Sequence, residues 1–151
     1  MLKIFKPCDF HVHLREGQLL KYVLKENNKN FQKILVMPNL IKPITNKNIL
    51  SKYRSFVLNN NNNTEILFTI YLNQDCSIID LKNMVNEKLF FAAKLYPFHA
   101  TTNSSSGVKD IKKMSKYFEF LENNKIPLCL HGEHIHENDD PYEREKKFLD
   151  F

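Results

Sequence analysis

The feature that most constrains the fold is a repeated alternation of short apolar runs with longer segments that carry hydrophobic residues at helical spacing. The apolar runs suit β-strands and lie at residues 3–13, 33–39, 65–72, 90–96 and 126–131. The segments with helical periodicity lie at residues 18–25, 46–58, 78–87, 109–124 and 142–151. Strands that alternate with helices form a parallel sheet with right-handed crossovers. We therefore predict an α/β fold in which successive βα units follow one another along the chain.

Polar residues that could take part in catalysis or ligand binding stand at the carboxyl ends of the predicted strands. They are His11, His13, Arg15, Asn39, Lys94 and His131. In parallel α/β folds, and in barrels above all, active sites lie at this edge of the sheet. The chain has three glycines and neither of the glycine-rich motifs that hold nucleotide phosphates, which argues against a nucleotide-binding doubly wound fold.

The first strand ends in a His-x-His pair, His11 and His13. Because side chains alternate along a strand, both imidazoles point to the same face of the sheet. Histidine nitrogens are zinc ligands, and a catalytic zinc keeps one position for water. Two histidines on one strand face also occur without a metal, so this pair alone leaves both interpretations open. The predicted convergence with His131 and Lys94 favours the metal.

Lys94 is an unusual companion for metal ligands, because a metal ion repels an ammonium group. The lysine would have to lose its proton or serve another role. A neutral amine that takes up carbon dioxide becomes a carbamate, whose two oxygens can bridge two metal ions. The alternative is an ion-paired lysine at a strand end.

Composition narrows the choice of partners and compartment. The net charge is +5, but the lysines are dispersed, which favours a solvated basic surface over a nucleic-acid site. No apolar run reaches the length of a membrane span, and the N-terminus has no long apolar signal core. Of the three cysteines, Cys8 and Cys129 lie in apolar runs, which predicts buried free thiols in a reducing compartment. We therefore expect a cytoplasmic protein without nucleic-acid or membrane partners.

Five short motifs, taken together, resemble the bacterial type of dihydroorotase within the amidohydrolase superfamily. They occur in that family's order, at residues 9–17 (DFHVHLREG), 36–40 (VMPNL), 92–97 (AAKLYP), 100–105 (ATTNSS) and 130–133 (LHGE). The fourth motif favours a dihydroorotase over another cyclic amidohydrolase such as a hydantoinase.

The resemblance implies a (β/α)8 TIM barrel that holds two zinc ions. His11 and His13 would bind the first metal, and His131 would bind the second. Lys94, carboxylated on its amine, would bridge the two ions and count as a catalytic residue. The implied reaction is the hydrolysis of a cyclic amide, which interconverts dihydroorotate and N-carbamoyl-L-aspartate in de novo pyrimidine biosynthesis.

The resemblance also implies a set of substrate contacts. Arg15 and Asn39 would hold the substrate carboxylate, for which a planar guanidinium is well suited. Thr101 and Thr102 would lie on a mobile loop that closes over the substrate. The implied substrate-binding residues are His13, Arg15, Asn39, Thr101, Thr102 and His131.

The family pattern also needs a histidine on the sixth strand and an aspartate on the eighth, both beyond Phe151. We therefore expect residues 1–151 to be the N-terminal part of a single barrel domain, truncated to about the first five βα units, and inactive alone. The alternative is a non-catalytic truncated barrel fragment, or half of a split enzyme that acts through a partner. Open strand edges invite association, so we expect a homodimer or a complementing C-terminal half.

Overall fold

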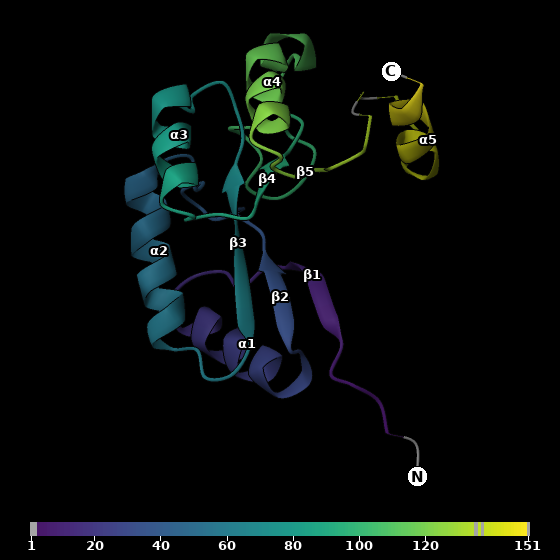
Figure 1. The fold of residues 1–151 in the computed structure, drawn as a ribbon. Coiled ribbons are helices and arrows are strands. Elements are labelled where there is room, and N and C mark those ends of the chain that lie inside the picture. The colour runs from purple at the N-terminus through teal and green to yellow at the C-terminus, as the bar shows by residue number, and fades with distance from the viewer. Residues whose placement is uncertain (1–2, 135, 137, 151) are drawn as a thin grey trace.

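Five parallel strands stand side by side in the order in which they occur along the chain (Figure 1). The structure is a computed structural model, and it describes residues 3–134, 136 and 138–150. The strands are β1 (Cys8–Val12), β2 (Lys33–Val36), β3 (Glu65–Tyr71), β4 (Ala92–Leu95) and β5 (Leu128–Leu130). A parallel sheet in sequential order is the arrangement found in the wall of a βα barrel. The predicted α/β class is confirmed.

In the described part of the chain, four helices connect the strands and cover one face of the sheet, and a fifth follows β5. They are α1 (Gly17–Asn30), α2 (Lys47–Asn59), α3 (Ile78–Asn86), α4 (Ser115–Asn123) and α5 (Arg144–Leu149). In Figure 1, α5 stands apart from the other four helices, at the end of an extended segment that follows β5. No helix in the described part of the chain has the length and hydrophobicity needed to cross a membrane.

Side-chain caps explain where two of the helices begin. Asn46 precedes α2, and its side-chain oxygen accepts a hydrogen bond of 3.0 Å from the Ile49 amide. Ser77 caps α3 in the same way by accepting from the Asp80 amide. Such caps satisfy amides that the first helical turn leaves without intrahelical partners.

Helix α1 continues to Asn30, five residues beyond the predicted end at residue 25. The added turn is polar in sequence, so hydrophobic periodicity does not reveal it. Its asparagines bond back onto the helix: the Asn27 side chain donates to the Val23 carbonyl at 2.9 Å, and the Asn30 side chain donates to the Glu26 carbonyl. These contacts satisfy amide groups that would otherwise compete with the helix.

The last two predicted helices are shorter than expected. The 109–124 segment begins with a 3₁₀ turn, η1 (Ile111–Met114), which Asp110 caps by accepting from the Lys112 amide, and continues as α4. The 142–151 segment consists of a 3₁₀ turn, η2 (Pro141–Glu143), followed by α5. Residue 151 of that prediction lies outside the described residues.

One face of the sheet packs against the helices, and the other face carries the predicted site. Alternate strand residues such as Ile34, Val36, Ala93 and Leu95 pack against the helices in one hydrophobic core. Helical members of that core are Leu20, Leu24, Leu50, Tyr53, Val57, Leu81, Met84, Tyr117 and Leu121. Because side chains alternate, Lys94 points to the opposite face, which carries the predicted site.

The predicted burial of Cys8 is wrong. Cys8 is exposed, Cys129 is half-buried and Cys76 is buried, and all three are free thiols. Cys8 opens β1, which is an edge strand of the sheet, so among the described residues β2 is its sole neighbouring strand and the outer side of β1 is left uncovered by a strand. The apolar run that begins at residue 3 enters the sheet only at Cys8, and Ile4 and Phe5 before it are exposed.

Candidate active site

A cavity of about 150 Å³ is lined by residues that immediately follow or end several of the strands. Its lining consists of His11, His13, Arg15, Asn39, Tyr96, Thr101, Thr102 and His131. Seven of these eight residues are ones that the sequence singles out, and Tyr96 is the addition. The tertiary structure therefore brings together, in one small cavity, residues that are spread over about 120 positions of the chain.

A larger cavity of about 470 Å³ lies elsewhere, between the 95–111 region and α5. Its lining is mostly apolar, includes Phe98 and Phe148, and contains none of the predicted site residues. An active site is identified by polar groups that converge in one cavity rather than by the volume of the cavity. We therefore take the smaller cavity as the candidate active site.

The His-x-His pair lies on one side of β1, as the strand period predicts. The ring centroids of His11 and His13 are 5.3 Å apart. The register between β1 and β2 shifts between Asp9 and Val12, so β1 carries one extra residue there. Such bulges re-aim side chains at barrel rims. The Asp9 carboxylate accepts a hydrogen bond of 2.9 Å from the His11 amide within this irregular stretch.

The surroundings of both histidines of the pair favour the neutral form of the imidazole. Burial, followed by the positive charge of Arg15, lowers the pKa of His13 to about 4 from its ordinary 6.5. Burial, followed by the charge of Lys94, also lowers the pKa of His11. A neutral imidazole offers a free nitrogen lone pair, which is the form that binds metals.

Two nitrogens of the predicted metal ligands are buried without a hydrogen-bond partner in the described part of the chain. They are Nδ1 of His13 and Nε2 of His131. Glu133 Oε1 lies 3.2 Å from His131 Nε2 without completing a hydrogen bond. A buried polar atom without a partner is costly, so these nitrogens are suited to a ligand from outside the chain.

Lys94 is buried beside the cavity rather than in its lining. Its side-chain nitrogen donates to the Leu130 carbonyl at 3.1 Å and lies 5.1 Å from the centroid of the Tyr96 ring. The residue is 3% exposed, and this burial lowers the pKa of its amine. The shift has the direction that the sequence argument requires, because a neutral amine is the reactive form.

No three side chains of the types His, Cys, Asp and Glu come together as a ready metal site among residues 3–134, 136 and 138–150. The predicted donor set therefore has His11 and His13 as its close pair, with His131 across the same cavity. A third donor near the pair would come from Lys94, whose charge acts on both histidines. The unpartnered nitrogens and the neutral imidazoles fit zinc in their donor chemistry.

The loop that carries Thr101 and Thr102 is tied to the end of β2. The Asn39 side-chain nitrogen donates to the Thr102 carbonyl at 2.7 Å, which leaves the Asn39 side-chain oxygen buried and without a partner among the described residues. The loop is also bonded internally: the Ser104 hydroxyl accepts from the Thr101 amide, and Ser104 is 1% exposed. Ser104 is therefore buried although its segment is polar, because its hydroxyl is satisfied within the loop.

Tyr96 is the site residue that sequence reasoning missed. It is fully buried, and its ring lies 6.0 Å from that of His131 and 5.0 Å from that of Tyr71. A signal was present, since Tyr96 stands two positions after Lys94 at the end of β4 and therefore shares its face of the sheet.

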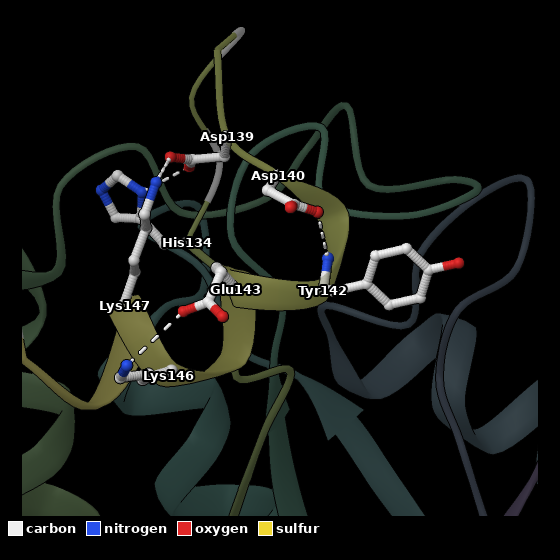
Figure 2. Close-up of polar contacts among 7 residues, drawn as sticks. All are labelled: His134, Asp139, Asp140, Tyr142, Glu143, Lys146 and Lys147. Atoms are coloured by element: carbon white, nitrogen blue, oxygen red, sulfur yellow. Dashed lines mark hydrogen bonds and ion pairs between the residues drawn. The ribbon is translucent and has the colours of Figure 1, made fainter.

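The remaining histidines lie outside the cavity. His99 and His136 are exposed. His134 is half-buried, and its Nδ1 lies 2.6 Å from the Asp139 carboxylate, whose other oxygen accepts from the Lys147 amine (Figure 2). His134 therefore contacts Asp139, and Asp139 in turn joins this segment to α5 through Lys147.

Comparisons with known proteins point to one group of enzymes. No family model matches the chain. A dihydroorotase of Buchnera aphidicola subsp. Acyrthosiphon pisum (strain Tuc7) is 40% identical over 152 aligned positions, which cover 99% of this chain and 43% of that protein. A dihydroorotase of Salmonella typhimurium is 39% identical over 153 positions, with 99% of this chain and 44% of that protein covered.

Solved structures give the same result. A dihydroorotase from Saccharomyces cerevisiae, determined with 5-fluoroorotic acid, superposes with a TM-score of 0.86 at 29% identity, over 95% of this chain and 42% of that one. A dihydroorotase from Campylobacter jejuni superposes with a TM-score of 0.84 at 33% identity, over 96% and 42%. The prediction of a TIM-barrel type fold, present here as a five-stranded part, is confirmed. The chain is thus similar to dihydroorotases over nearly all of its own length and over less than half of theirs.

Proposed function

We propose that this chain supplies part of the active site of a metal-dependent dihydroorotase, an enzyme of the cytoplasm. The reaction would be the reversible hydrolysis of a cyclic amide, between dihydroorotate and N-carbamoyl-L-aspartate in pyrimidine biosynthesis. The observation that carries the proposal is the single cavity lined by His11, His13, Arg15 and His131. Three free cysteines agree with a reducing compartment.

We assign the residues of the cavity to two tasks. Arg15 would pair with the substrate carboxylate through its guanidinium group. Asn39 holds the loop of Thr101 and Thr102 across the cavity through its bond to the Thr102 carbonyl, and the two threonines would contact the substrate from there. This differs from direct carboxylate binding by Asn39, because in this arrangement its amide nitrogen is already engaged.

His11 and His13 would hold one zinc ion, His131 a second, and Lys94 in carboxylated form would bridge the two. Zinc, when bound, supplies polarisation of the amide carbonyl and a water of lowered pKa. The lowered pKa values of His11 and His13 and of the Lys94 amine support this assignment.

Zinc uptake by the purified chain tests the metal assignment. We expect equilibrium dialysis to show zinc bound by the wild type and lost in a His11→Ala/His13→Ala variant. The matched control is His99→Ala/His136→Ala, which removes two exposed histidines and should bind like the wild type. Equal uptake by all three proteins would remove the metal site from the proposal.

The substrate assignment is tested separately, by calorimetry with L-dihydroorotate and N-carbamoyl-L-aspartate. We expect both to bind the wild type and neither to bind Arg15→Met at the same concentration, because the side chain keeps its length but loses the guanidinium group. Binding of a hydantoin in preference to both compounds would favour another cyclic amidohydrolase. No binding of any of them would favour the non-catalytic alternative.

The two edges of the sheet indicate how this chain could associate with another chain. The outer edges of β1 and β5 have no strand partner within the described residues. Unpaired strand edges promote association, so we propose that they are covered in the working protein by a second copy or by a complementing half. The molar mass in solution, measured by light scattering, distinguishes a dimer of this chain from a single copy.

A further inference from the structure

Tyr96 is the residue of the cavity lining that the proposed function leaves without a task. It is 1% exposed, and in the described part of the chain its buried hydroxyl completes no hydrogen bond, although the Asn39 side chain lies beside it. A buried hydroxyl without a partner is costly, and folded proteins rarely keep one without a reason. Because Tyr96 lines the cavity, a ligand held there can supply the missing partner.

The surroundings of Tyr96 define what kind of ligand that is. None of the eight residues that line the cavity is acidic, and Arg15 adds a permanent positive charge. A tyrosine hydroxyl is a hydrogen-bond donor as well as an acceptor, so Tyr96 can donate to a ligand in the cavity. The one carboxylate beside this lining, that of Glu133, faces His131, and a donor next to the Arg15 guanidinium group suits an anionic oxygen.

Tyr71 provides an internal comparison. Its ring stacks on that of Tyr96 at 5.0 Å, it is equally buried, and its hydroxyl likewise has no partner among the described residues. Unlike Tyr96, it does not belong to the lining of the cavity. The two tyrosines therefore share chemistry and burial but differ in access to a ligand.

We propose that the Tyr96 hydroxyl is a ligand-binding group, which donates a hydrogen bond to the carboxylate that Arg15 pairs with. The inference rests on the proposed function for the identity of the natural ligand, and on the cavity alone for the chemical class of a carboxylate. It makes Tyr96 a specificity residue that favours anionic over neutral cyclic amides.

The experiment measures dissociation constants by calorimetry for Tyr96→Phe, for Tyr71→Phe and for the wild type. The two probes are L-dihydroorotate and malonate, a carboxylate without the ring. We expect Tyr96→Phe to weaken binding of both probes about tenfold or more, the usual effect of losing a hydrogen bond to a charged group. Tyr71→Phe should bind both within about twofold of the wild type. The thermal midpoint of Tyr96→Phe should stay equal or rise, because the variant removes an unsatisfied buried hydroxyl.

The outcomes separate the two proposals. If the wild type binds malonate but not dihydroorotate, the proposed substrate is wrong. The ratio of the malonate dissociation constants of Tyr96→Phe and the wild type still decides the role of Tyr96. Wild-type affinity in Tyr96→Phe would overturn the inference. Equal weakening in both variants, or a lowered thermal midpoint with unchanged affinity, would overturn it as well, because the hydroxyl would then be structural. No binding of either probe to the wild type would overturn both proposals.

Discussion

The hydroxyl of Tyr53, in the middle of α2, donates a hydrogen bond of 3.1 Å to the backbone carbonyl of Arg15, which lies in the turn between β1 and α1. Arg15 has a φ of 63°, a left-handed conformation that a non-glycine residue adopts at a cost. Tyr53 is buried and packs edge-on against the Phe68 ring at 6.4 Å. A core residue of one helix therefore holds the backbone from which a predicted substrate contact projects.

Removing this bond should lower stability. We expect Tyr53→Phe to reduce the free energy of unfolding by about 1 kcal/mol, since the variant keeps the ring but leaves the part-buried Arg15 carbonyl with one fewer donor. Urea denaturation followed by circular dichroism measures the change. Tyr22→Phe on the exposed side of α1 is the control and should match the wild type. A Tyr53→Phe variant as stable as the control would show that the bond contributes nothing.

Acid should destabilise the fold through His13. The pKa of His13 is about 4 when folded and about 6.5 when unfolded, so the unfolded chain binds more protons between these values. The free energy of unfolding should therefore fall as the pH drops from 6.5 towards 4. His13 is partly exposed, and we expect its share of the loss to be about 2 kcal/mol at most. Denaturation at pH 7 and pH 4.5 should show a smaller pH effect in His13→Gln than in the wild type; an identical effect would contradict this account.

Two neighbouring leucines of α1 should respond very differently to truncation. Leu20 is 1% exposed and belongs to the core, whereas Leu19 is 55% exposed. We expect Leu20→Ala to cost about 3 kcal/mol, because it removes buried methyl groups and leaves a cavity. Leu19→Ala should change the free energy of unfolding by less than about 0.5 kcal/mol. Similar losses in both variants, measured by urea denaturation, would mean that α1 does not pack as described.

The Asp139 carboxylate should hold the segment after β5 against α5. Its oxygens contact the His134 ring and the Lys147 amine, both at 2.6 Å (Figure 2), and these partners, with Lys147 first, lower the pKa of Asp139 to about 2. We expect Asp139→Asn to speed hydrogen exchange in residues 144–149 while β2 and β3 stay protected.

The downward shift in the pKa of Asp139 determines how this contact depends on pH. A lowered carboxylate pKa means that the contact is fully present above the unfolded pKa of about 3.8 and is lost as the pH falls towards 2. Glu145→Gln, a change of an exposed carboxylate on α5, is the matched control and should exchange like the wild type. Equal exchange in Asp139→Asn and the control would show that the ion pair does not restrain α5.

Local patterns along the chain were enough to predict the order of strands and helices and the edge of the sheet where the site lies. Hydrophobic periodicity reports which face of a segment is buried, and a strand period of two places His11 and His13 on one side without any knowledge of the rest. The residues of the cavity also followed from motifs, since all eight lining residues stand in segments that resemble one family, although only seven of them were singled out as site residues. The polar end of α1 and the 3₁₀ turn before α4 were not predicted, because neither asparagine contacts nor the type of turn produces a hydrophobic periodicity in the sequence.

Contacts between distant segments needed the folded chain. Tyr53 and Arg15 are 38 positions apart, and Asn39 and Thr102 are 63 apart, so neither bond has a local sequence signal. The exposure of Cys8, the burial of Ser104 and the unpartnered hydroxyl of Tyr96 depend in the same way on what packs over each residue. Periodicity determines which way a side chain faces, but its partners, its burial and its pKa depend on segments that meet only after the sheet has assembled.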